Sequence, residues 1–284
     1  MSAGTAAAVQ DDLPLLKIRP SKGWSALDLG DVWHYRELVF FLAWRDIQVR
    51  YKQTVLGVAW VVLQPLLTTF VFTVIFGNLA RMPSDNLPYA VFAMAALVPW
   101  NFFAGAFARG GTSLVSSASL ISKVYFPRLV IPIASVLAGL VDLAIALCVL
   151  AALTLYYGFR PGAALLTLPF FLLLALGAAL GVGLWLSALN VQYRDVGYLI
   201  PFVAQLWFYA TPIVYPLSLI PERWRAWMGL NPMVAVAEGF RWAVLGKAPP
   251  SAGLLALSAV VVAGLLVSGA LVFRRMEKTF ADVV

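Results

Sequence analysis

The chain has 284 residues, of which 62% are hydrophobic and only 12% are charged. Ordinary soluble domains are about 45–50% apolar with glycine included and about 25% charged, and a soluble fold of this size could not hide so much apolar surface. The composition therefore indicates an integral membrane protein and excludes a soluble enzyme, a disordered chain and a DNA-binding module. The net charge of +7 is more typical of cytoplasmic loops than of nucleic-acid binding.

The first segment, residues 1–30, contains Asp11, Asp12, Lys17 and Arg19. It lacks the apolar core that a secretory signal requires. We expect a disordered cytoplasmic tail.

Residues 31–52, with the sequence DVWHYRELVFFLAWRDIQVRYK, have the pattern of an amphipathic helix. At about 100° per residue, Glu37, Arg45, Gln48 and Lys52 fall on one face, and large apolar side chains lie beside them. A basic, aromatic-rich helix of this kind lies in the membrane interface. Two functions are open: a simple membrane anchor, or a helix whose polar face binds another cytoplasmic subunit.

Uncharged runs locate the membrane spans, because a helix needs about 20 mostly apolar residues to cross a bilayer. Six candidate spans follow, at about 56–79, 87–108, 130–157, 163–189, 196–217 and 252–273. Six spans place both termini on one side of the membrane. That side would hold 14 of the 20 Lys and Arg residues, so the positive-inside rule places both termini in the cytoplasm. The expected fold is an all-α membrane protein.

The loop 109–128, RGGTSLVSSASLISKVYFPR, is longer than a connection between two spans needs to be. We expect Gly110 and Gly111 to end the second span and residues 112–126 to form a short helix that Pro127 stops. The loop is either solvated or binds a partner. The candidate contact residues are Ser119, Ile121, Ser122, Lys123 and Tyr125.

Residues 211–247 face the opposite side and are too apolar for a soluble loop. One short helix is expected from Pro221 to Gly229, and a second from Pro232 to Gly246 with Asn231 as its cap. Neither is long enough to span, so both would dip into the outer leaflet as re-entrant segments, which is allowed only where protein or water shields their backbone. The segment is either a lid over a pore exit or an interfacial belt of aromatic and basic residues. The candidate gate residues are Pro221, Glu222, Arg223, Trp224, Trp227, Asn231, Pro232, Glu238 and Arg241.

Several sequence motifs appear in a characteristic order along the chain. RDIQVRYKQTVLGVAWVVLQPL begins in the second half of the amphipathic helix, SLISKVYFPRLVIPIA begins in the first cytoplasmic loop, and ATPIVYP and NPM precede the last span. Over about residues 31–280 this order resembles the ABC-2 type permeases that export polysaccharides, the membrane subunits of O-antigen, capsule and teichoic-acid exporters. The chain has no G-x-x-x-x-G-K-[ST] P-loop, which fits a family in which a separate ATPase binds nucleotide.

The resemblance implies a transport subunit rather than an enzyme, with residues 53–284 as the ABC-2 transmembrane domain. It implies that helix 31–52 contacts the ATPase, that a coupling helix near 113–126 sits in an ATPase groove, and that the two short helices after Pro212 form the outer gate. It also implies a homodimer with the pore between the copies, above two ATPase subunits that bind ATP and Mg, with no cofactor in this chain. The substrate would be a glycan on a lipid pyrophosphate or similar anchor, crossing a bacterial cytoplasmic (inner) membrane.

A polar polymer needs weak, repeated contacts to cross a membrane, and aromatic rings offer apolar faces for sugars as well as polar tips. The candidate channel residues are Trp60, Phe72, Tyr89, Trp100, Trp207, Tyr209 and Tyr215, for which a lipid-facing belt or helix packing is the competing explanation. Asp142, the one charge in the third span, is expected to form a structural hydrogen bond across helices, although a pore-facing or protonated group stays open.

Three alternatives compete with polysaccharide export. An ABC-2 permease for a drug or a lipid is the first. A membrane enzyme of glycan assembly would need convergent carboxylates, histidines or a metal site, and only Glu222 and Glu238 lie close together on the outer side. A passive channel without an ATPase is the third, and the long cytoplasmic loop argues against it.

Overall fold

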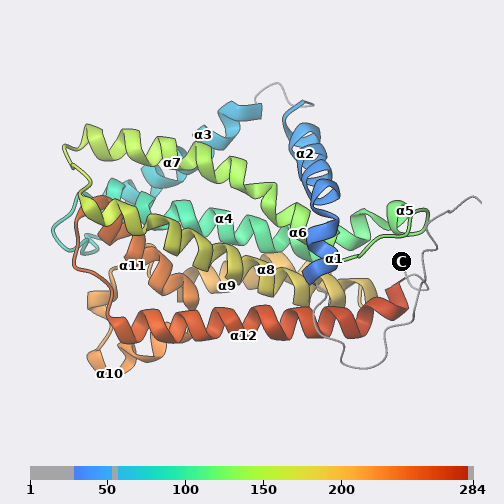
Figure 1. Cartoon of the computed structure of the whole chain (residues 1–284). Helices are drawn as coiled ribbons and strands as arrows, with labels where there is room; N and C mark the ends of the chain where they lie inside the picture. The colour runs from blue at the N-terminus through green and yellow to red at the C-terminus, as the bar shows by residue number, and fades with distance from the viewer. Residues whose placement is uncertain (1–28, 53–56, 281–284) are drawn as a thin grey trace, which may run out of the picture.

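The computed structural model describes residues 29–52 and 57–280, and within these ranges every regular element is a helix (Figure 1). The expected disordered tail falls almost entirely outside the described residues. The long helices lie roughly along one common axis, and α2 crosses that axis at a steep angle. The bundle has two ends, the α5 end and the α10 end. The α5 end carries α5 and the last turn of the chain's final helix, and the α10 end carries α10 and the neighbouring loops.

Helices of membrane length account for five of the predicted spans. They extend over Ala59–Leu79, Tyr89–Ser116, Val130–Tyr156, Ala163–Gln192 and Ala252–Met276. The first consists of α3 (Gly57–Phe72) and the π-helical turn η1 (Thr73–Leu79), and the second is α4 (Tyr89–Ser116). The third divides into α6 (Val130–Leu137) and α7 (Gly139–Tyr156). The fourth joins η2 (Ala163–Thr167) to α8 (Leu168–Gln192), and the last is α12 (Ala252–Met276).

The remaining elements are shorter. They are α1 (Leu29–His34) and α2 (Arg36–Lys52) before the first span, α5 (Ala118–Ile121) after α4, α9 (Val196–Ala210), η3 (Leu217–Leu219), α10 (Glu222–Arg225), η4 (Trp227–Leu230), α11 (Pro232–Leu245) and η5 (Glu277–Thr279). The single helix predicted for residues 31–52 is therefore divided by a turn at Tyr35.

The predicted span 196–217 is not a helix of membrane length. Its helix, α9, ends at Ala210, so its 15 residues extend only about 22 Å, against a hydrocarbon core of about 30 Å. The cause is Pro212, because a residue that precedes proline is forced out of the helical region. Thr211 accordingly has an extended backbone, with φ −101° and ψ 135°.

Helix α4 forms the centre of the bundle, with α3, α6, α7, α8, α9 and α11 packed around it. The prediction that Gly110 and Gly111 end this helix was wrong, since it continues to Ser116. Both glycines are buried, and a methyl group on Gly110 would lie 3.4 Å from the Cα atom of Gly183 on α8. The glycines therefore serve close helix packing rather than termination.

Helices α8 and α12 meet along a line of small residues. A methyl group on Gly181 would lie 2.8 Å from the carbonyl carbon of Leu265, and one on Gly269 would lie 2.5 Å from the carbonyl oxygen of Gly181. Backbones can approach this closely only where neither helix carries a side chain. Without a hydrophobic driving force between helices in lipid, such packing is a main source of their association.

This packing gives a first prediction. Gly181→Ala should destabilise the folded protein by about 1–3 kcal/mol, because the added methyl group meets backbone that cannot move aside. The measurement is thermal unfolding of the purified protein in detergent. Gly264→Ala on α12 is the matched control, since a methyl group there meets nothing within 4 Å. Equal thermal stability of the two variants would contradict the described packing.

Candidate functional site

Helix α2 presents one buried and one free face. Val39, Leu42 and Ala43 are buried and belong to the same apolar cluster as residues of α6. The four predicted polar residues, Glu37, Arg45, Gln48 and Lys52, are all exposed. Exposed aromatic residues flank them, namely Trp33, Phe40, Phe41 and Trp44. The helix thus has an apolar contact to the bundle, an aromatic flank suited to the lipid interface, and a polar face that the described chain does not cover.

Two polar contacts fix the C-terminal half of α2 to the bundle. Asp46 forms an ion pair with Arg45 at 2.9 Å and accepts a hydrogen bond from the Ser135 hydroxyl of α6 at 3.2 Å. In the last turn of α2, Arg50 and Tyr51 both donate to the two carboxylate oxygens of Asp142 on α7. Burial, together with the neighbouring carboxylate, raises the pKa of Tyr51 to about 12, so its phenol stays protonated and can donate.

Asp142 also faces a second cation, Arg109 of α4, whose Nη1 lies 3.9 Å from its Oδ2. The contact across helices expected for Asp142 is therefore present, and its partners come from α2 and α4. The sequence did not reveal these partners, because Arg109 lies in the segment predicted as the loop 109–128 and Arg50 is 92 positions away from Asp142. We name Arg50, Tyr51, Arg109 and Asp142 the Asp142 cluster.

The loop after α4 contains less helix than expected. Instead of a helix over 112–126, α4 runs to Ser116, α5 is a single turn, and residues 124–127 are irregular. Ser119, Ser122, Lys123 and Tyr125 are exposed at the α5 end, whereas Ile121 is buried among apolar residues of the bundle. Ile121 therefore anchors the loop and is not available to a partner.

The loop is also tied to the last helix. The Arg128 guanidinium donates to the carbonyl oxygen of Glu277, and the Arg128 amide donates to the Glu277 carboxylate at 3.2 Å. The same carboxylate lies 3.4 Å from Arg274 of α12. A shallow cavity of about 300 Å³ lies against the loop, lined by residues 121–126 and Arg128. A force applied to this loop would therefore reach α12 as well as α4.

The predicted channel aromatics are not one group. Phe72, Trp100 and Trp207 are part of a packed aromatic cluster with Phe76, Phe103, Phe107 and Phe208, in which ring centroids are 4.9–6.2 Å apart. Tyr89 is buried, and its hydroxyl donates to the carbonyl of Val214 at 2.7 Å. The partly exposed Tyr215 donates to the carbonyl of Tyr209 at 3.2 Å. Only Trp60 and Tyr209 expose more than half of their surface.

The predicted gate residues divide into an exposed and a buried set. Pro221, Glu222, Arg223, Trp224 and Trp227 are exposed at the α10 end. The helix expected from Pro221 to Gly229 is replaced by the single turn α10 and the 3₁₀ turn η4. The second expected helix is present as α11, where the Asn231 side chain accepts from the Met233 amide at 3.1 Å and Gly246, with φ +70°, ends the helix.

Helix α11 is buried on nearly all sides, since Trp242 alone among its residues is not buried. Its Arg241 is fully buried and holds three segments together. The guanidinium bonds Glu238 at 2.8 Å, the carbonyl of Ile213 at 2.9 Å and the carbonyl of Phe92 at 3.3 Å, and it stacks on the Phe92 ring at 3.6 Å. Glu238 and Arg241 are therefore structural groups rather than exposed gate residues.

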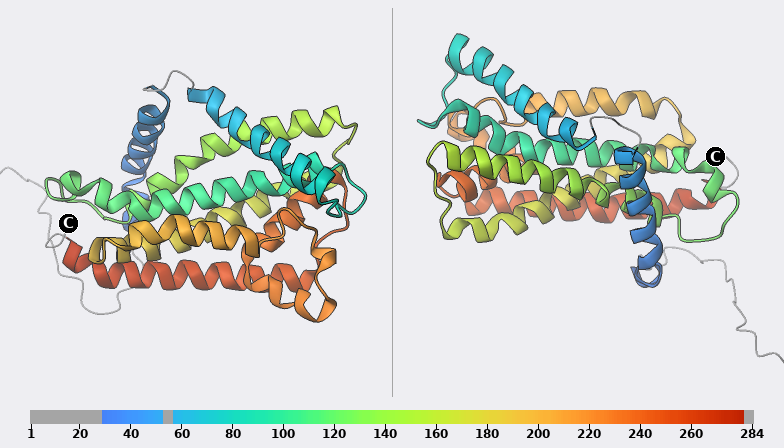
Figure 2. Two further views of the ribbon diagram at one scale, coloured as in Figure 1. Left: turned by 180° about the vertical axis from the view of Figure 1, so that it is seen from behind. Right: turned by 90° about the horizontal axis from the view of Figure 1, so that it is seen from above.

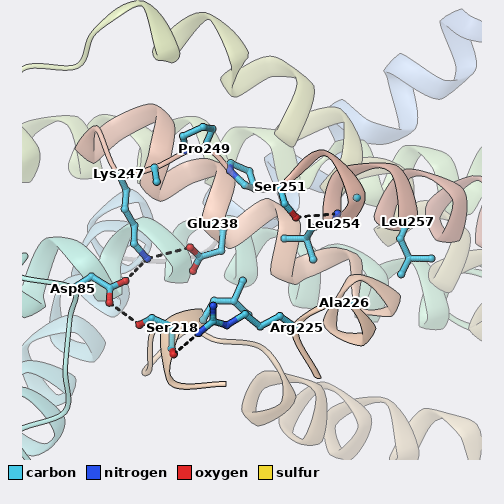
Figure 3. Close-up of a pocket in the computed structure, with 14 residues that line it drawn as sticks. Asp85, Ser218, Arg225, Ala226, Glu238, Lys247, Pro249, Ser251, Leu254 and Leu257 are labelled. Atoms are coloured by element: carbon cyan, nitrogen blue, oxygen red, sulfur yellow. Dashed lines mark hydrogen bonds and ion pairs between the residues drawn. The ribbon is translucent and has the colours of Figure 1, made fainter. Parts of the chain in front are cut away.

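Glu238, the partner of Arg241, also lines a cavity that the sequence did not reveal (Figure 3). Lys247 lies 3.1 Å from Glu238 and also pairs with Asp85, which accepts from Ser218 at 2.7 Å. Although burial alone would raise it, the hydrogen bonds from Lys247 and Ser218 hold the pKa of Asp85 below its ordinary value. These residues and Arg225 line a cavity of about 580 Å³ at the α10 end. Asp85 and Lys247 were missed because each stands alone in the sequence, more than 100 residues from the other.

Comparison with known proteins adds sequence relationships to this geometry. A profile of the ABC-2 type transporter family matches residues 37–245. The O-antigen export system permease protein RfbA of Myxococcus xanthus is 31% identical over 257 residues, which cover 89% of this chain and 98% of that protein. A Klebsiella pneumoniae protein of the same name is 28% identical over 87% of this chain and 95% of that protein. The polysialic acid transport protein KpsM of Escherichia coli is 25% identical over 71% of this chain and 78% of that protein.

The Arg241 contacts yield a second prediction. Arg241→Met should lower the stability of the folded protein by about 3 kcal/mol or more, because Glu238 loses a buried partner and two carbonyls lose their donor. Denaturant unfolding in detergent measures the loss. Arg223→Met at an exposed position is the control and should change little. An Arg241→Met variant as stable as the control would contradict the role given to Arg241.

Proposed function

The chain belongs to the ABC-2 type transporter family, and on that premise we propose that it is the permease subunit that exports a lipid-linked polysaccharide of the O-antigen or capsule type. It is a transport subunit rather than an enzyme, and in this family an ABC ATPase partner handles the nucleotide. The observation that carries the substrate class is the match to O-antigen export permeases along almost the whole of both chains. A multi-pass chain of this family resides in the inner membrane.

We assign the α5 end to the cytoplasm and the α10 end to the outside. The distribution of Lys and Arg along the sequence supports this orientation. It places the polar face of α2 and the exposed residues Ser119, Ser122, Lys123 and Tyr125 on the side where an ATPase would bind. Movement of the ATPase would act on this loop and on α2. The ties of the loop to α4 and α12 would carry the movement into the membrane.

The exposed turn at the α10 end suits a gate. Glu222, Arg223, Trp224 and Trp227 project from a short, irregular stretch, whereas Asn231 and the buried α11 fix its base. The Trp207 indole donates to Asn231 at 2.9 Å, and Asn231 donates to the Thr211 hydroxyl at 2.9 Å. We propose that residues 217–230 move while α11 stays in place.

A conduit needs a surface that the chain itself leaves open. In its second half α4 has a stripe of small or polar residues that are exposed or half-buried, and the residues between them are buried except for the half-buried Arg109. The stripe consists of Asn101, Ala104, Gly105, Ala108 and Thr112. Helices α3 and α9 flank α4 on one face of the bundle and carry exposed Trp60 and Tyr209 (Figure 2, left). We propose that two copies of the chain face each other across this surface and that the glycan passes between them, above two ATPase subunits.

The test of the function is made in the bacterium that carries the gene. Deleting the gene should abolish polysaccharide at the cell surface and leave lipid-linked polysaccharide on the cytoplasmic side, because synthesis precedes export. Immunoblotting of intact and permeabilised cells with a polysaccharide-specific antibody measures both pools. Pull-down of the tagged chain should also recover an ABC ATPase. Normal surface polysaccharide in the deletion strain would overturn the proposed substrate class.

The exposed aromatics provide a residue-level prediction. Trp60→Ala combined with Tyr209→Ala should reduce export severalfold without loss of folded protein, because both side chains are largely exposed and their removal leaves the core intact. Surface polysaccharide and membrane protein level are measured together. Tyr156→Ala is the matched control, since Tyr156 is an exposed aromatic residue at the end of α7. If export is equal in the double variant and the control, these two residues do not contact the substrate.

A further inference from the structure

The Asp142 cluster joins α2 to α4 and α7 in the bundle. Asp142 is the sole carboxylate in the described helices of membrane length, and Arg109 lies well inside α4. Arg50 and Tyr51 come from the last turn of α2, directly before the chain enters its first span. An ionised carboxylate at this depth is expensive unless it keeps a partner. If α2 moves away from α7, Asp142 therefore needs another partner for its carboxylate.

The two cations of the cluster are engaged unequally. Arg50 and Tyr51 make direct contacts with the Asp142 carboxylate. Arg109 stays at 3.9 Å, beyond the roughly 2.7–2.9 Å of a charge-assisted hydrogen bond. The Nε atom of Arg109 is buried and has no hydrogen-bond partner among the described residues. The guanidinium thus has unused hydrogen-bonding capacity next to the carboxylate.

The Arg109 guanidinium also packs against two glycines. A methyl group on Gly139, at the break between α6 and α7, would lie 2.1 Å from Nη2 of Arg109. A methyl group on Gly105, one turn before Arg109 in α4, would lie 2.9 Å from Nη1. The guanidinium fits beside Asp142 because neither position has a side chain.

We propose that Arg109 is a positioning residue that acts as the alternate partner of Asp142. In the conformation described here Asp142 holds the end of α2 through Arg50 and Tyr51. When α2 moves away, Asp142 transfers to Arg109, which needs only a short approach. The movement then exchanges one partner for another and never leaves the carboxylate unpaired, so α2 can detach and return at low cost. This inference rests on the proposed function, because it makes the exchange a step in coupling the ATPase to export.

The experiment uses the chain in complex with its ATPase, reconstituted with a lipid-linked polysaccharide of the O-antigen type. Spin labels on native Cys148 of α7 and on Val49→Cys of α2, both exposed positions outside the polar face of α2, report the distance between the two helices. Mixing labelled chain with an excess of unlabelled Cys148→Ser chain isolates distances within one copy. Export per ATP hydrolysed is the second readout.

In the unmodified complex the distance should change when ATP binds. In Arg109→Gln the distance between the two labels should stay at its value without nucleotide. Export per ATP should fall about tenfold, because the alternate charge-assisted hydrogen bond is lost. Arg109→Lys should restore part of the ATP-dependent distance change and part of the export per ATP. Arg50→Gln with Tyr51→Phe should show the ATP-bound distance without ATP, because Asp142 is then held by Arg109 alone.

A second route tests the same point if Arg109→Gln does not fold. Gly139→Ala keeps every charge but displaces the flexible end of Arg109 from its position beside Gly139. It should therefore also abolish the ATP-dependent change in the label distance and lower the export per ATP. Gly264→Ala is its control. The exchange would be overturned if Arg109→Gln or Gly139→Ala showed the wild-type distance change and wild-type export. It would also be overturned if the distance between the labels did not change when ATP binds to the complex without these substitutions. A complex that couples ATP to the distance change but exports no polysaccharide would instead contradict the proposed function.

Discussion

The fold depends on the rule that a charge removed from water must keep a partner. At the α10 end the fully buried Arg241 satisfies this rule through Glu238 and the carbonyls of Phe92 and Ile213. Because these partners come from α4, α11 and the chain after α9, one guanidinium fixes the relative position of three segments. Helix α11 is too short to span a membrane, and the surrounding protein buries almost all of its residues.

The same helix serves both charged clusters. Phe92, near the start of α4, accepts from Arg241, and Arg109, 17 residues later, faces Asp142. At 1.5 Å per residue the two points are about 26 Å apart, most of the hydrocarbon thickness. A well-packed helix transmits displacement with little compression. Helix α4 is therefore the element best placed to connect the loop and α2 at the α5 end with the Arg241 contacts at the α10 end.

Composition and charge placement predicted most of the fold, because lipid imposes strong rules on span length and backbone pairing. Five spans follow directly from those rules, and the cap and stop residues of α11 follow from the helix-end preferences of Asn, Pro and Gly. The errors came from residues whose role depends on a neighbour distant in sequence. Gly110 carries a helix-ending signal, but Gly183 on α8 makes it a packing residue. Arg109 and Asp142 are 33 positions apart, and Glu238 and Arg241 resemble exposed lid residues until the carbonyls that surround Arg241 are known.

The surface of α4 supports the proposed second copy of the chain. Asn101 and Thr112 are exposed on a helix that is otherwise mostly buried, and the residues between them on that stripe are small. The Thr112 hydroxyl donates to the Ala108 carbonyl at 3.1 Å, whereas the Asn101 amide would lose its hydrogen bonds to water if it faced hydrocarbon. The stripe therefore needs either water or another protein surface in front of it. The proposed homodimer would satisfy both conditions if it encloses a hydrated passage, and the small side chains of Ala104 and Ala108 would leave room along its wall for a sugar chain. The exposed apolar residues of α8, such as Leu173, have no polar neighbours of this kind and suit contact with lipid.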